Sequence, residues 1–336
     1  MNTTPEPLLD VRDLRVTFSR RGRRDVAAVD GVSLTVGAGQ TVGVVGESGS
    51  GKSVTSLAIM GLLPRRGVRV EGQVSFDGRS LLTMTDDQLR QVRGRDIAMV
   101  FQDPMTSLNP VIPVGVQVTE VLERHRGMSG REARDEAARL LERVGIPDGR
   151  QRLKEYPHQL SGGMRQRALI AIALACQPRL LIADEPTTAL DVTIQAQILE
   201  LLKELVAASG TALILITHDL GVVAGLCDTV NVMYSGRIVE SAPRHPLFGS
   251  PRHPYTGGLL GSVPRLDAPR AEPLRPIPGS PNDTLPWPNG CAFAPRCANR
   301  IDTCTEVTPD LEWTGERGLR CHNPLAPAEL SAGAAR

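Results

Sequence analysis

Eight consecutive residues, Gly46 to Ser53, have the types and spacing of a loop that binds phosphate groups. They fit the pattern G-x-x-x-x-G-K-[ST] without a mismatch. In such a loop the glycines let backbone N–H groups converge on the phosphates, Lys52 neutralises the β and γ charges, and Ser53 offers its hydroxyl to Mg²⁺. The predicted nucleotide-binding residues of this P-loop are Gly46, Ser48, Gly49, Ser50, Gly51, Lys52 and Ser53.

The segments on either side of the loop have the patterns that a phosphate site requires. Residues 41–45 are a short apolar run typical of a buried strand. Residues 53–63 predict a helix that stops before Pro64. Its predicted apolar face consists of Val54, Leu57, Ala58 and Leu62. This context favours a nucleotide site over a chance match in a surface loop.

Two carboxylates follow the very apolar run at residues 180–183, which predicts a buried strand. Open α/β sheets place ligand-contacting groups at the carboxyl ends of their strands. We therefore expect Asp184 to hold Mg²⁺ with its water shell, and Glu185 to polarise the water that attacks the γ-phosphate. The alternative is that Asp184 and Glu185 merely begin a loop, and the preceding P-loop and buried strand favour the catalytic interpretation.

Two more polar residues come directly after predicted strands. His218 follows the strand at 212–216, and we expect it to contact the γ-phosphate, although a lone histidine is usually structural. Gln102 follows the strand at 97–101 and could reach Mg²⁺ or the attacking water, or simply cap the strand. Both residues are predicted at the same sheet edge as the P-loop.

A second phosphate-binding helix start is predicted at residues 161–163. Ser161, Gly162 and Gly163 open an apolar helix, which presents bare N–H groups and the positive end of the helix dipole. Two such elements in one chain suggest a dimer in which the second element closes over the nucleotide of the partner. A plain N-cap by Ser161 is the alternative.

The elements that must position these residues alternate between strand and helix over about 200 residues, which predicts a parallel sheet covered on both faces. Alternating residues within 8–36 predict an antiparallel β region, with a basic loop at 20–24. Between 109 and 159 the pattern becomes helical, and Ser129 with Glu132 forms a capping box. The apolar stripe of that helix is Ala133, Ala137, Leu140, Leu141 and Val144.

Composition and length limit the function classes. The chain has 336 residues, of which 41% are hydrophobic and 22% are charged, as in soluble globular proteins. A net charge of +1 and an aromatic content of 3% give little support for nucleic-acid binding. We find no signal-peptide layout, and the longest apolar run, 168–176, is too short to span a bilayer. We expect a cytosolic chain that works at a membrane only by docking onto other subunits.

From residue 241 proline and glycine become dense and periodicity is lost, which predicts a domain boundary. The predicted tail contains Cys291, Cys297, Cys304 and Cys321 within 31 residues, with gaps of five, six and sixteen. Such gaps differ from the C-x₂-C pairs of common structural zinc sites. Four thiolates can hold zinc or an iron–sulfur cluster. The other two cysteines, Cys176 and Cys227, lie in apolar contexts and are expected in the core.

Taken together, the motifs resemble the ordered motif set of the ATP-binding cassette ATPases over about residues 8–330. The resemblance implies an α/β P-loop fold with a mostly parallel sheet, helices on both faces, an antiparallel β subdomain and a helical insert. It implies a nucleotide-binding domain at 8–240, with its helical subdomain at about 103–177, and an irregular extension at 241–330. The motifs are 46–53, Gln102, 160–167, 181–186, 189–191 and 216–219.

The same resemblance implies the ligands and the assembly. ATP with Mg²⁺ would lie between the P-loop of one subunit and the Ser161 element of the other, in a head-to-tail dimer, and Asp191 would belong to the nucleotide site. The helical insert would contact a transmembrane partner.

Four segments narrow the resemblance to the ATPases of dipeptide and oligopeptide importers, with the D-type subunit as the closer match. These segments are 46–54, 101–110, 156–159 and 252–256. That family has a cysteine-bearing extension associated with a [4Fe–4S] cluster, so the resemblance favours this cluster at the four tail cysteines over zinc or free thiols. It further implies an F-type ATPase partner in a heterodimer, two permease subunits, an extracytoplasmic peptide-binding protein and a peripheral place on the cytoplasmic face of the inner membrane.

One departure and two alternatives remain. Many cassette ATPases stack the adenine on an aromatic residue between the first two strands, where this chain has Arg23 and Arg24, with only Phe18 nearby. Guanidinium stacking could substitute for the aromatic ring. The alternative functions are an importer ATPase for another small solute, such as nickel or glutathione, and a soluble cassette ATPase acting on ribosomes or DNA. The latter usually has two cassettes or a long coiled-coil insertion, and neither pattern is seen.

Overall fold

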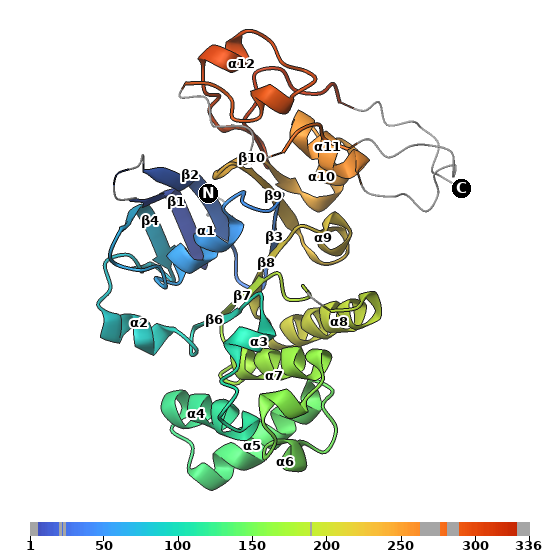
Figure 1. Ribbon diagram of the computed structural model, residues 1–336. Helices are drawn as coiled ribbons and strands as arrows, with labels where there is room; N and C mark the ends of the chain where they lie inside the picture. The colour runs from blue at the N-terminus through green and yellow to red at the C-terminus, as the bar shows by residue number, and fades with distance from the viewer. Residues whose placement is uncertain are drawn as a thin grey trace.

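An eight-stranded sheet runs through the protein and a smaller sheet packs beside it (Figure 1). The computed structural model describes residues 6–19, 22, 25–188, 190–262, 276–280 and 289–327. In the large sheet the strand order is β11-β12-β10-β9-β3-β8-β7-β6. Its strands are β3 Thr41–Val45, β6 Ile97–Val100, β7 Leu180–Asp184, β8 Ala212–Thr217, β9 Thr229–Tyr234, β10 Arg237–Pro243, β11 Glu312–Thr314 and β12 Arg317–Leu319.

The five strands from β9 to β6 pair in parallel, and β10, β12 and β11 continue the sheet antiparallel. Alternate residues of the parallel strands face two different cores. Leu181 and Leu213 belong to one core, and the neighbouring Ile182 and Ile214 belong to the other. Because both faces are buried, these strands are continuous apolar runs rather than alternating ones. The predicted sheet with both faces covered is confirmed.

The smaller sheet is antiparallel, with the order β2-β1-β4-β5. It packs against the second core together with α1 and α2. Its β4–β5 hairpin turns at Asp77 and Gly78, whose φ angles are 52° and 72°. This confirms the predicted antiparallel β region. Its strands are β1 Leu9–Phe18, β2 Val26–Val36, β4 Val68–Phe76 and β5 Arg79–Ser80.

The helix after the P-loop differs from its prediction. This helix, α1, runs over Lys52–Ile59 rather than 53–63, because Gly61 takes a left-handed conformation with φ 62°. Its buried face consists of Lys52, Thr55, Ser56, Ala58 and Ile59, whereas the predicted core residue Leu62 is 39% exposed.

The predicted helical insert is confirmed and lies in the lower part of Figure 1. In the capping box, Glu132 Oε2 accepts the Ser129 N–H at 3.0 Å, and the Ser129 hydroxyl accepts the Glu132 N–H. The predicted apolar stripe of α5 is buried. The helices of the insert are α3 Pro104–Ser107, α4 Val114–Arg126, α5 Gly130–Arg143, α6 Gly149–Arg152, η1 Pro157–Gln159 and α7 Gly162–Leu174.

The C-terminal region has more regular structure than its lack of periodicity predicts. Strand β10 runs across the expected boundary at 240/241, and β12 pairs with it, so this region continues the large sheet. Two short helices follow β10 and then the cysteine-bearing segment begins. The remaining helices of the described chain are α2 Asp86–Val92, α8 Val192–Ser209, α9 Leu220–Leu226, α10 Arg244–Gly249, α11 Pro254–Gly261, η2 Ala294–Arg296 and α12 Thr303–Glu306.

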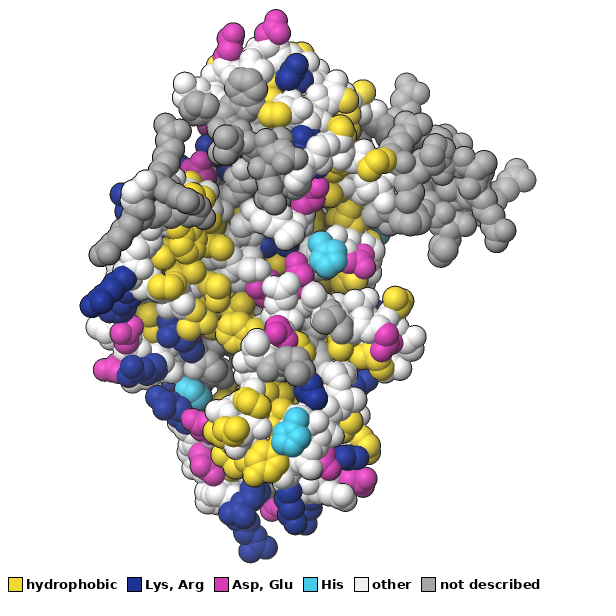
Figure 2. All heavy atoms as spheres, viewed as in Figure 1, with side chains coloured by type: hydrophobic (Ala, Val, Ile, Leu, Met, Phe, Trp, Pro, Cys, Tyr) yellow, Lys and Arg dark blue, Asp and Glu magenta, His cyan; other side chains and the backbone are white. Residues whose placement is uncertain are grey.

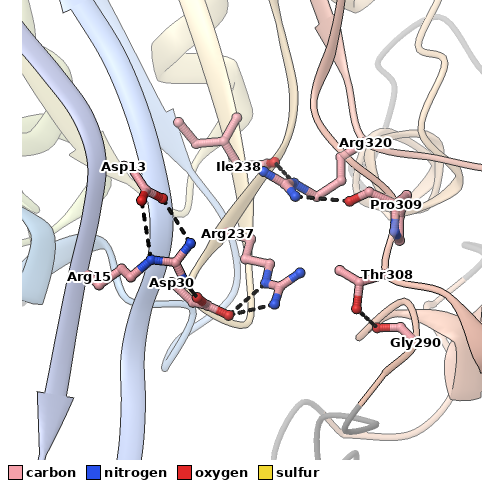
Figure 3. Close-up of polar contacts among 9 residues, drawn as sticks. All are labelled: Asp13, Arg15, Asp30, Arg237, Ile238, Gly290, Thr308, Pro309 and Arg320. Carbon is pink, nitrogen blue, oxygen red and sulfur yellow. Dashed lines mark hydrogen bonds and ion pairs between the residues drawn. The ribbon is translucent and has the colours of Figure 1, made fainter. Parts of the chain in front are cut away.

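Polar contacts around β10 join the two sheets and the C-terminal segment (Figure 3). Arg237 Nε on β10 donates to Asp30 on β2 at 2.9 Å. Arg320, directly after β12, donates from Nε to the Ile238 carbonyl at 3.0 Å and from Nη1 to the Pro309 carbonyl at 2.9 Å. These bonds fix the start of β10 from both sides.

Hydropathy gives one further result. Among the described helices, none has the length and apolar character needed to cross a membrane.

Candidate functional site

The P-loop connects β3 to α1 and depends on close backbone contacts. A Cβ atom at Gly51, where φ is 101°, would lie 2.4 Å from the Ala28 carbonyl oxygen. At Gly46 a Cβ atom would lie 2.2 Å from the Met233 carbonyl oxygen. The loop packs directly against the backbone of β2 and β9, so only glycine fits at these two positions. This packing gives the backbone amides of the loop a fixed arrangement.

Lys52 begins α1 and points back into the loop. Its side chain is 4% exposed, and Nζ donates to the carbonyl oxygens of Gly46 at 2.8 Å and Glu47 at 3.0 Å. Burial lowers the pKa of Lys52, and nearby carboxylates, with Glu185 first, partly oppose this shift. The ammonium group is therefore incompletely compensated and would be favoured by an added anion such as phosphate.

Two serines of the loop have polar atoms suited to a ligand. Ser53 Oγ donates to Asp184 Oδ1 at 3.0 Å, which joins α1 to the end of β7. Burial raises the pKa of Asp184, and the bond from Ser53 opposes the shift. Among the described residues, the buried Ser50 hydroxyl has no hydrogen-bond partner. The Ser53 hydroxyl and the Asp184 carboxylate lie side by side. Both are hard oxygen donors of the kind that Mg²⁺ prefers, so this pair fits the ion.

The Glu185 carboxylate is the centre of the predicted catalytic group. Its Oε2 accepts a hydrogen bond from Gln102 Nε2 at 3.0 Å and lies 3.5 Å from His218 Nδ1. Its Oε1 lies 4.0 Å from Lys52 Nζ. The side chain is 13% exposed, so it is reachable by water but held in place. The ends of β6, β7 and β8 and the start of α1 thus bring four predicted residues together.

The backbone of Glu185 is unusual for a residue with a side chain. Its φ is 46°, in the left-handed region, and its N–H donates to the Ile216 carbonyl at 2.8 Å on the neighbouring strand. Thr188 Oγ1 also donates to Glu185 Oε2 at 2.9 Å. Conformations of this kind cost energy and are concentrated at active sites. No sequence signal predicted this strain or the Thr188 contact.

The predicted second phosphate element lies apart from the P-loop. Ser161 caps α7 by accepting the Met164 N–H at 3.3 Å, and Gly163 packs against Ile194 of α8. In the described chain, no hydrogen bond joins 161–163 to 46–53, and Figure 1 places α7 with the helical insert. The structure therefore does not bring Ser161, Gly162 and Gly163 to the nucleotide loop of the same chain.

Asp191 is also outside the group around Glu185. It caps α8, because its Oδ1 accepts the Ile194 N–H at 3.0 Å. For the adenine contact, Phe18 ends β1 and is half-buried, whereas Arg23 and Arg24 lie outside the described residues. The identity of the adenine contact stays a prediction.

Sequence reasoning also missed two contacts on Glu47, the second residue of the P-loop. Its backbone N–H donates to the Tyr255 hydroxyl at 2.9 Å, and its carboxylate receives two hydrogen bonds from Arg296. Tyr255 belongs to the importer-like segment 252–256, which was a usable signal. Arg296 had none.

All six cysteines are unpaired. The Cys291 N–H donates to the Cys304 carbonyl at 2.8 Å, which holds the two segments of the tail together. Burial raises the pKa of Cys321 to about 12, and the three other tail thiols add to the shift. The described residues contain no group of three or more His, Cys, Asp or Glu side chains arranged to hold a metal. Cys227 is a core residue as predicted, and Cys176 is half-buried.

Two protein families match this chain. Residues 29–188 match the family described as ABC transporter, and residues 239–304 match the oligopeptide/dipeptide transporter, C-terminal region. The chain is 52% identical over 324 residues to the oligopeptide transport ATP-binding protein OppD of Salmonella typhimurium, covering 96% of each chain. It is 55% identical over 305 residues to the dipeptide transport ATP-binding protein DppD of Bacillus subtilis, covering 90% of each.

A solved structure supports the same relationship. The ATP-binding cassette MJ0796, as a dimer in a post-hydrolysis state bound to ADP and Pi, matches with a TM-score of 0.63 and 31% identity. The match covers 70% of this chain and 98% of that one.

Proposed function

This chain belongs to the ATP-binding cassette ATPases of oligopeptide and dipeptide transporters, and we propose that it binds and hydrolyses ATP to energise the import of such peptides. The observation that carries the ATPase chemistry is the contact set of Glu185 with Gln102, His218 and Lys52, directly beyond the P-loop. The match of residues 239–304 to the transporter C-terminal region supports peptides as the cargo.

We propose the following roles around the phosphates. The P-loop amides and Lys52 bind the phosphate chain, and the unpaired Ser50 hydroxyl supports a ligand at that place. Ser53, Asp184 and Gln102 would hold Mg²⁺, which when bound neutralises charge that develops on the phosphate oxygens. The remaining proposed phosphate-binding residues of the loop are Gly46, Ser48, Gly49 and Gly51.

Glu185 is proposed as the general base. Its carboxylate lies at the sheet edge beside Lys52 and is partly open to water, so it can orient and deprotonate a water that attacks the γ-phosphate. His218, at 3.5 Å from Glu185, is proposed to contact the γ-phosphate. Gln102 holds the Glu185 carboxylate through its amide nitrogen, which leaves the amide oxygen of the same side chain as the proposed ligand for Mg²⁺.

We propose a head-to-tail dimer because one chain holds only half of a site. The helix start at Ser161, Gly162 and Gly163 lies apart from the P-loop of its own chain, so it is available to close over the nucleotide of a partner. Asp191, which caps α8 near this helix start, would face the same interface. The dimeric state of the similar cassette MJ0796 supports this arrangement.

The similarity to oligopeptide and dipeptide transporter subunits supports an assembly with other proteins. The partner is proposed to be an F-type ATPase subunit, with two permease subunits against the helical insert and an extracytoplasmic peptide-binding protein. The chain would then lie peripherally on the cytoplasmic face of the inner membrane. We also propose the division into a nucleotide-binding domain at 8–240, with its helical subdomain at about 103–177, and an extension at 241–330.

For the four tail cysteines we propose a [4Fe–4S] cluster, with zinc and free thiols as the alternatives. The donor set of Cys291, Cys297, Cys304 and Cys321 suits such a cluster, and the hydrogen bond from the Cys291 N–H to the Cys304 carbonyl at 2.8 Å supports the proximity of two of these residues. The side chains as described do not form a closed ligand set, so a cluster would require them to turn. An anaerobically purified sample without iron and labile sulfide would refute the cluster. Stoichiometric zinc in that sample would favour the zinc alternative.

Substitution of Glu185 tests the ATPase proposal directly. Glu185→Gln should keep ATP binding, trap the closed dimer and lower turnover of the purified transporter by about 100-fold or more, the size expected for loss of a general base. Lys52→Ala should instead abolish binding. Unchanged turnover in Glu185→Gln would contradict the assignment.

The two alternative functions have less support. On the face seen in Figure 2, Lys and Arg side chains alternate with Asp and Glu side chains, without the basic surface typical of a ribosome or DNA binder. Co-purification with ribosomes or DNA, and without an integral membrane subunit, would favour that alternative. A different small solute, such as nickel or glutathione, would be recognised by the binding protein and permease rather than by this chain.

A further inference from the structure

The P-loop residue Glu47 is held by the C-terminal region through two separate contacts. Its backbone N–H donates to Tyr255 Oη at 2.9 Å. Its carboxylate accepts from Arg296 Nη1 at 2.7 Å and from Arg296 Nη2 at 3.0 Å. Its carbonyl oxygen in turn accepts from Lys52 Nζ at 3.0 Å. Glu47 therefore connects the phosphate-binding lysine to α11 and to the segment that carries the tail cysteines.

Arg296 is built to hold a carboxylate in one orientation. Its side chain is 3% exposed, and its other guanidinium N–H groups donate to the carbonyl oxygens of Pro278 at 2.9 Å and Gly279 at 3.3 Å. The guanidinium carbon lies 5.8 Å from the Tyr234 ring centroid and 6.0 Å from that of Phe293. A buried, bidentate arginine pair fixes both distance and orientation of its partner.

Tyr255 fixes the backbone at the same residue. It is fully buried, and its ring packs against those of Tyr234, at 4.7 Å between centroids, and Phe293, at 5.3 Å. Because its hydroxyl accepts the Glu47 N–H, this amide is already engaged by the C-terminal extension. The peptide plane between Gly46 and Glu47 is therefore set by a rigid aromatic group outside the P-loop.

We propose that Tyr255 and Arg296 are positioning residues for the P-loop, so that the C-terminal extension sets the affinity of the site for Mg-ATP. Neither side chain needs to touch the nucleotide. Both act through Glu47, whose position determines where Lys52 and the neighbouring amides lie. The proposal rests on the proposed ATP site and adds a function for the extension.

The competing explanation is that these contacts only attach the extension to the rest of the protein. In that case their loss would lower the melting temperature without a specific effect on nucleotide binding. Arg317 offers a matched control, because it lies in the same extension and donates to the carbonyl oxygens of Ser250 at 2.8 Å and Pro246 at 2.7 Å. It also lies 3.5 Å from the Glu240 carboxylate, and a lysine at this position keeps the positive charge opposite Glu240. Among the described contacts of Arg317, none reaches Glu47 or Lys52.

The test uses the full-length chain and measures the Kd for Mg-ATP, the KM and kcat of ATP hydrolysis, and the melting temperature without nucleotide. The variants are Tyr255→Phe, Arg296→Lys, Glu47→Gln and the double variant Arg296→Lys/Glu47→Gln, with Arg317→Lys as the control. Tyr255→Phe removes only the hydroxyl, so it keeps the test valid if a charge variant fails to fold.

We expect Tyr255→Phe and Arg296→Lys each to raise Kd and KM by about five- to tenfold, as for loss of a hydrogen bond to a charged or fixed group, with kcat changed by less than about twofold. The double variant should be no weaker than Arg296→Lys, because the two residues act as one unit. Arg317→Lys should keep the wild-type Kd.

Two results would overturn the proposal. One is a wild-type Kd in folded Tyr255→Phe and Arg296→Lys, and the other is an equal loss of affinity in Arg317→Lys. Failure of the wild-type chain itself to bind Mg-ATP would contradict the proposed function instead, so the two failures are distinguishable.

Discussion

Ser53 Oγ donates to Asp184 Oδ1 at 3.0 Å, which joins the first turn of α1 to the last residue of β7. The two residues are 131 positions apart. Burial lowers the pKa of the neighbouring Lys52 and raises that of Asp184, so both groups are less favourable in their charged forms than in water. The nucleotide site therefore carries an electrostatic cost in the free protein, which bound Mg-ATP would offset.

Asp184→Asn should raise the melting temperature of the nucleotide-free protein and abolish the further rise that Mg-ATP produces. The folded-state pKa of Asp184 is raised, so stability falls as pH rises from the ordinary carboxyl range through that pKa, and the ionised group opposes folding at neutral pH. We expect a melting temperature about 2 °C higher without nucleotide. Asp87→Asn, on an exposed carboxylate of α2, is the control and should change neither quantity. A lower melting temperature for Asp184→Asn would contradict the argument.

Gln102→Ala should slow hydrolysis without weakening the binding of metal-free ATP. Gln102 is exposed and its amide holds the Glu185 carboxylate at 3.0 Å, so its loss should leave stability within about 0.5 kcal/mol but free the proposed base from its orientation. We expect kcat to fall about tenfold, at the low end for a positioned acid–base group, with an unchanged Kd for ATP measured without Mg²⁺. Single-turnover ATPase assays and equilibrium binding measure the two quantities. A large rise in the metal-free Kd would show that Gln102 acts on the nucleotide itself and not through Mg²⁺ and Glu185.

The parts of this site that sequence could predict are those encoded locally. The loop 46–53 and the apolar runs that became β7 and β8 are continuous signals, because a strand buried on both faces needs no polar residues. The polar residues after such runs had to meet at one edge, since parallel strands end together. Glu185 and Lys52 meet in this way, with Glu185 Oε1 4.0 Å from Lys52 Nζ.

What sequence could not predict depends on the packing of distant segments. Arg296 lies 249 positions from Glu47, and nothing near either residue specifies the other. The left-handed backbone of Glu185 is fixed by its bond to Ile216 on the next strand. The predicted α1 was too long because Leu62 is apolar and fitted the helical pattern. In the structure the left-handed conformation of Gly61 ends the helix before Leu62.

Gly51→Ala should destabilise the protein far more than Gly127→Ala. Both glycines have positive φ, 101° and 62°, so both substitutions strain the backbone. At Gly51 the new Cβ would also lie 2.4 Å from the Ala28 carbonyl oxygen, whereas at Gly127 nothing lies within 4 Å. We expect a loss of about 3 kcal/mol or more at Gly51 and about 1 kcal/mol at Gly127. Denaturant unfolding of both variants measures the difference, and equal losses would refute the close contact.

His253→Asn should flatten the acid dependence of stability. His253 is buried, its Nδ1 accepts the Tyr255 N–H at 3.0 Å, and burial lowers its pKa to about 3. Glu240, a buried carboxylate, accepts the backbone N–H of His253, and Arg317 lies 3.5 Å from Glu240. A depressed histidine pKa gives stability that is present above pH 6.5 and lost as pH falls toward 3, with a slope of up to about 1.4 kcal/mol per unit.

Unfolding free energies between pH 6.5 and 4 should therefore fall less steeply for His253→Asn than for the wild type. His158→Asn, on an exposed histidine of η1, serves as the control and should follow the wild-type curve. Parallel curves for His253→Asn and the wild type would show that this histidine is not held neutral by the fold.

Cys297→Ser should lower both the metal content and the affinity for Mg-ATP. Cys297 follows Arg296 directly and ends the short helix η2 that contains Arg296. A metal bound to the Cys297 thiol would therefore restrain the backbone that carries Arg296. If the four tail thiols hold iron or zinc as proposed, loss of one ligand should release the ion and let Arg296 shift away from Glu47.

Cys176→Ser is the control, because Cys176 lies in the helical insert with its Sγ 3.7 Å from the Val121 carbonyl. We expect iron, labile sulfide and zinc content to fall in Cys297→Ser only, with Kd for Mg-ATP raised about fivefold, as for loss of one hydrogen bond. Loss of metal with an unchanged Kd would show that the cysteine site does not influence the affinity of the P-loop for Mg-ATP.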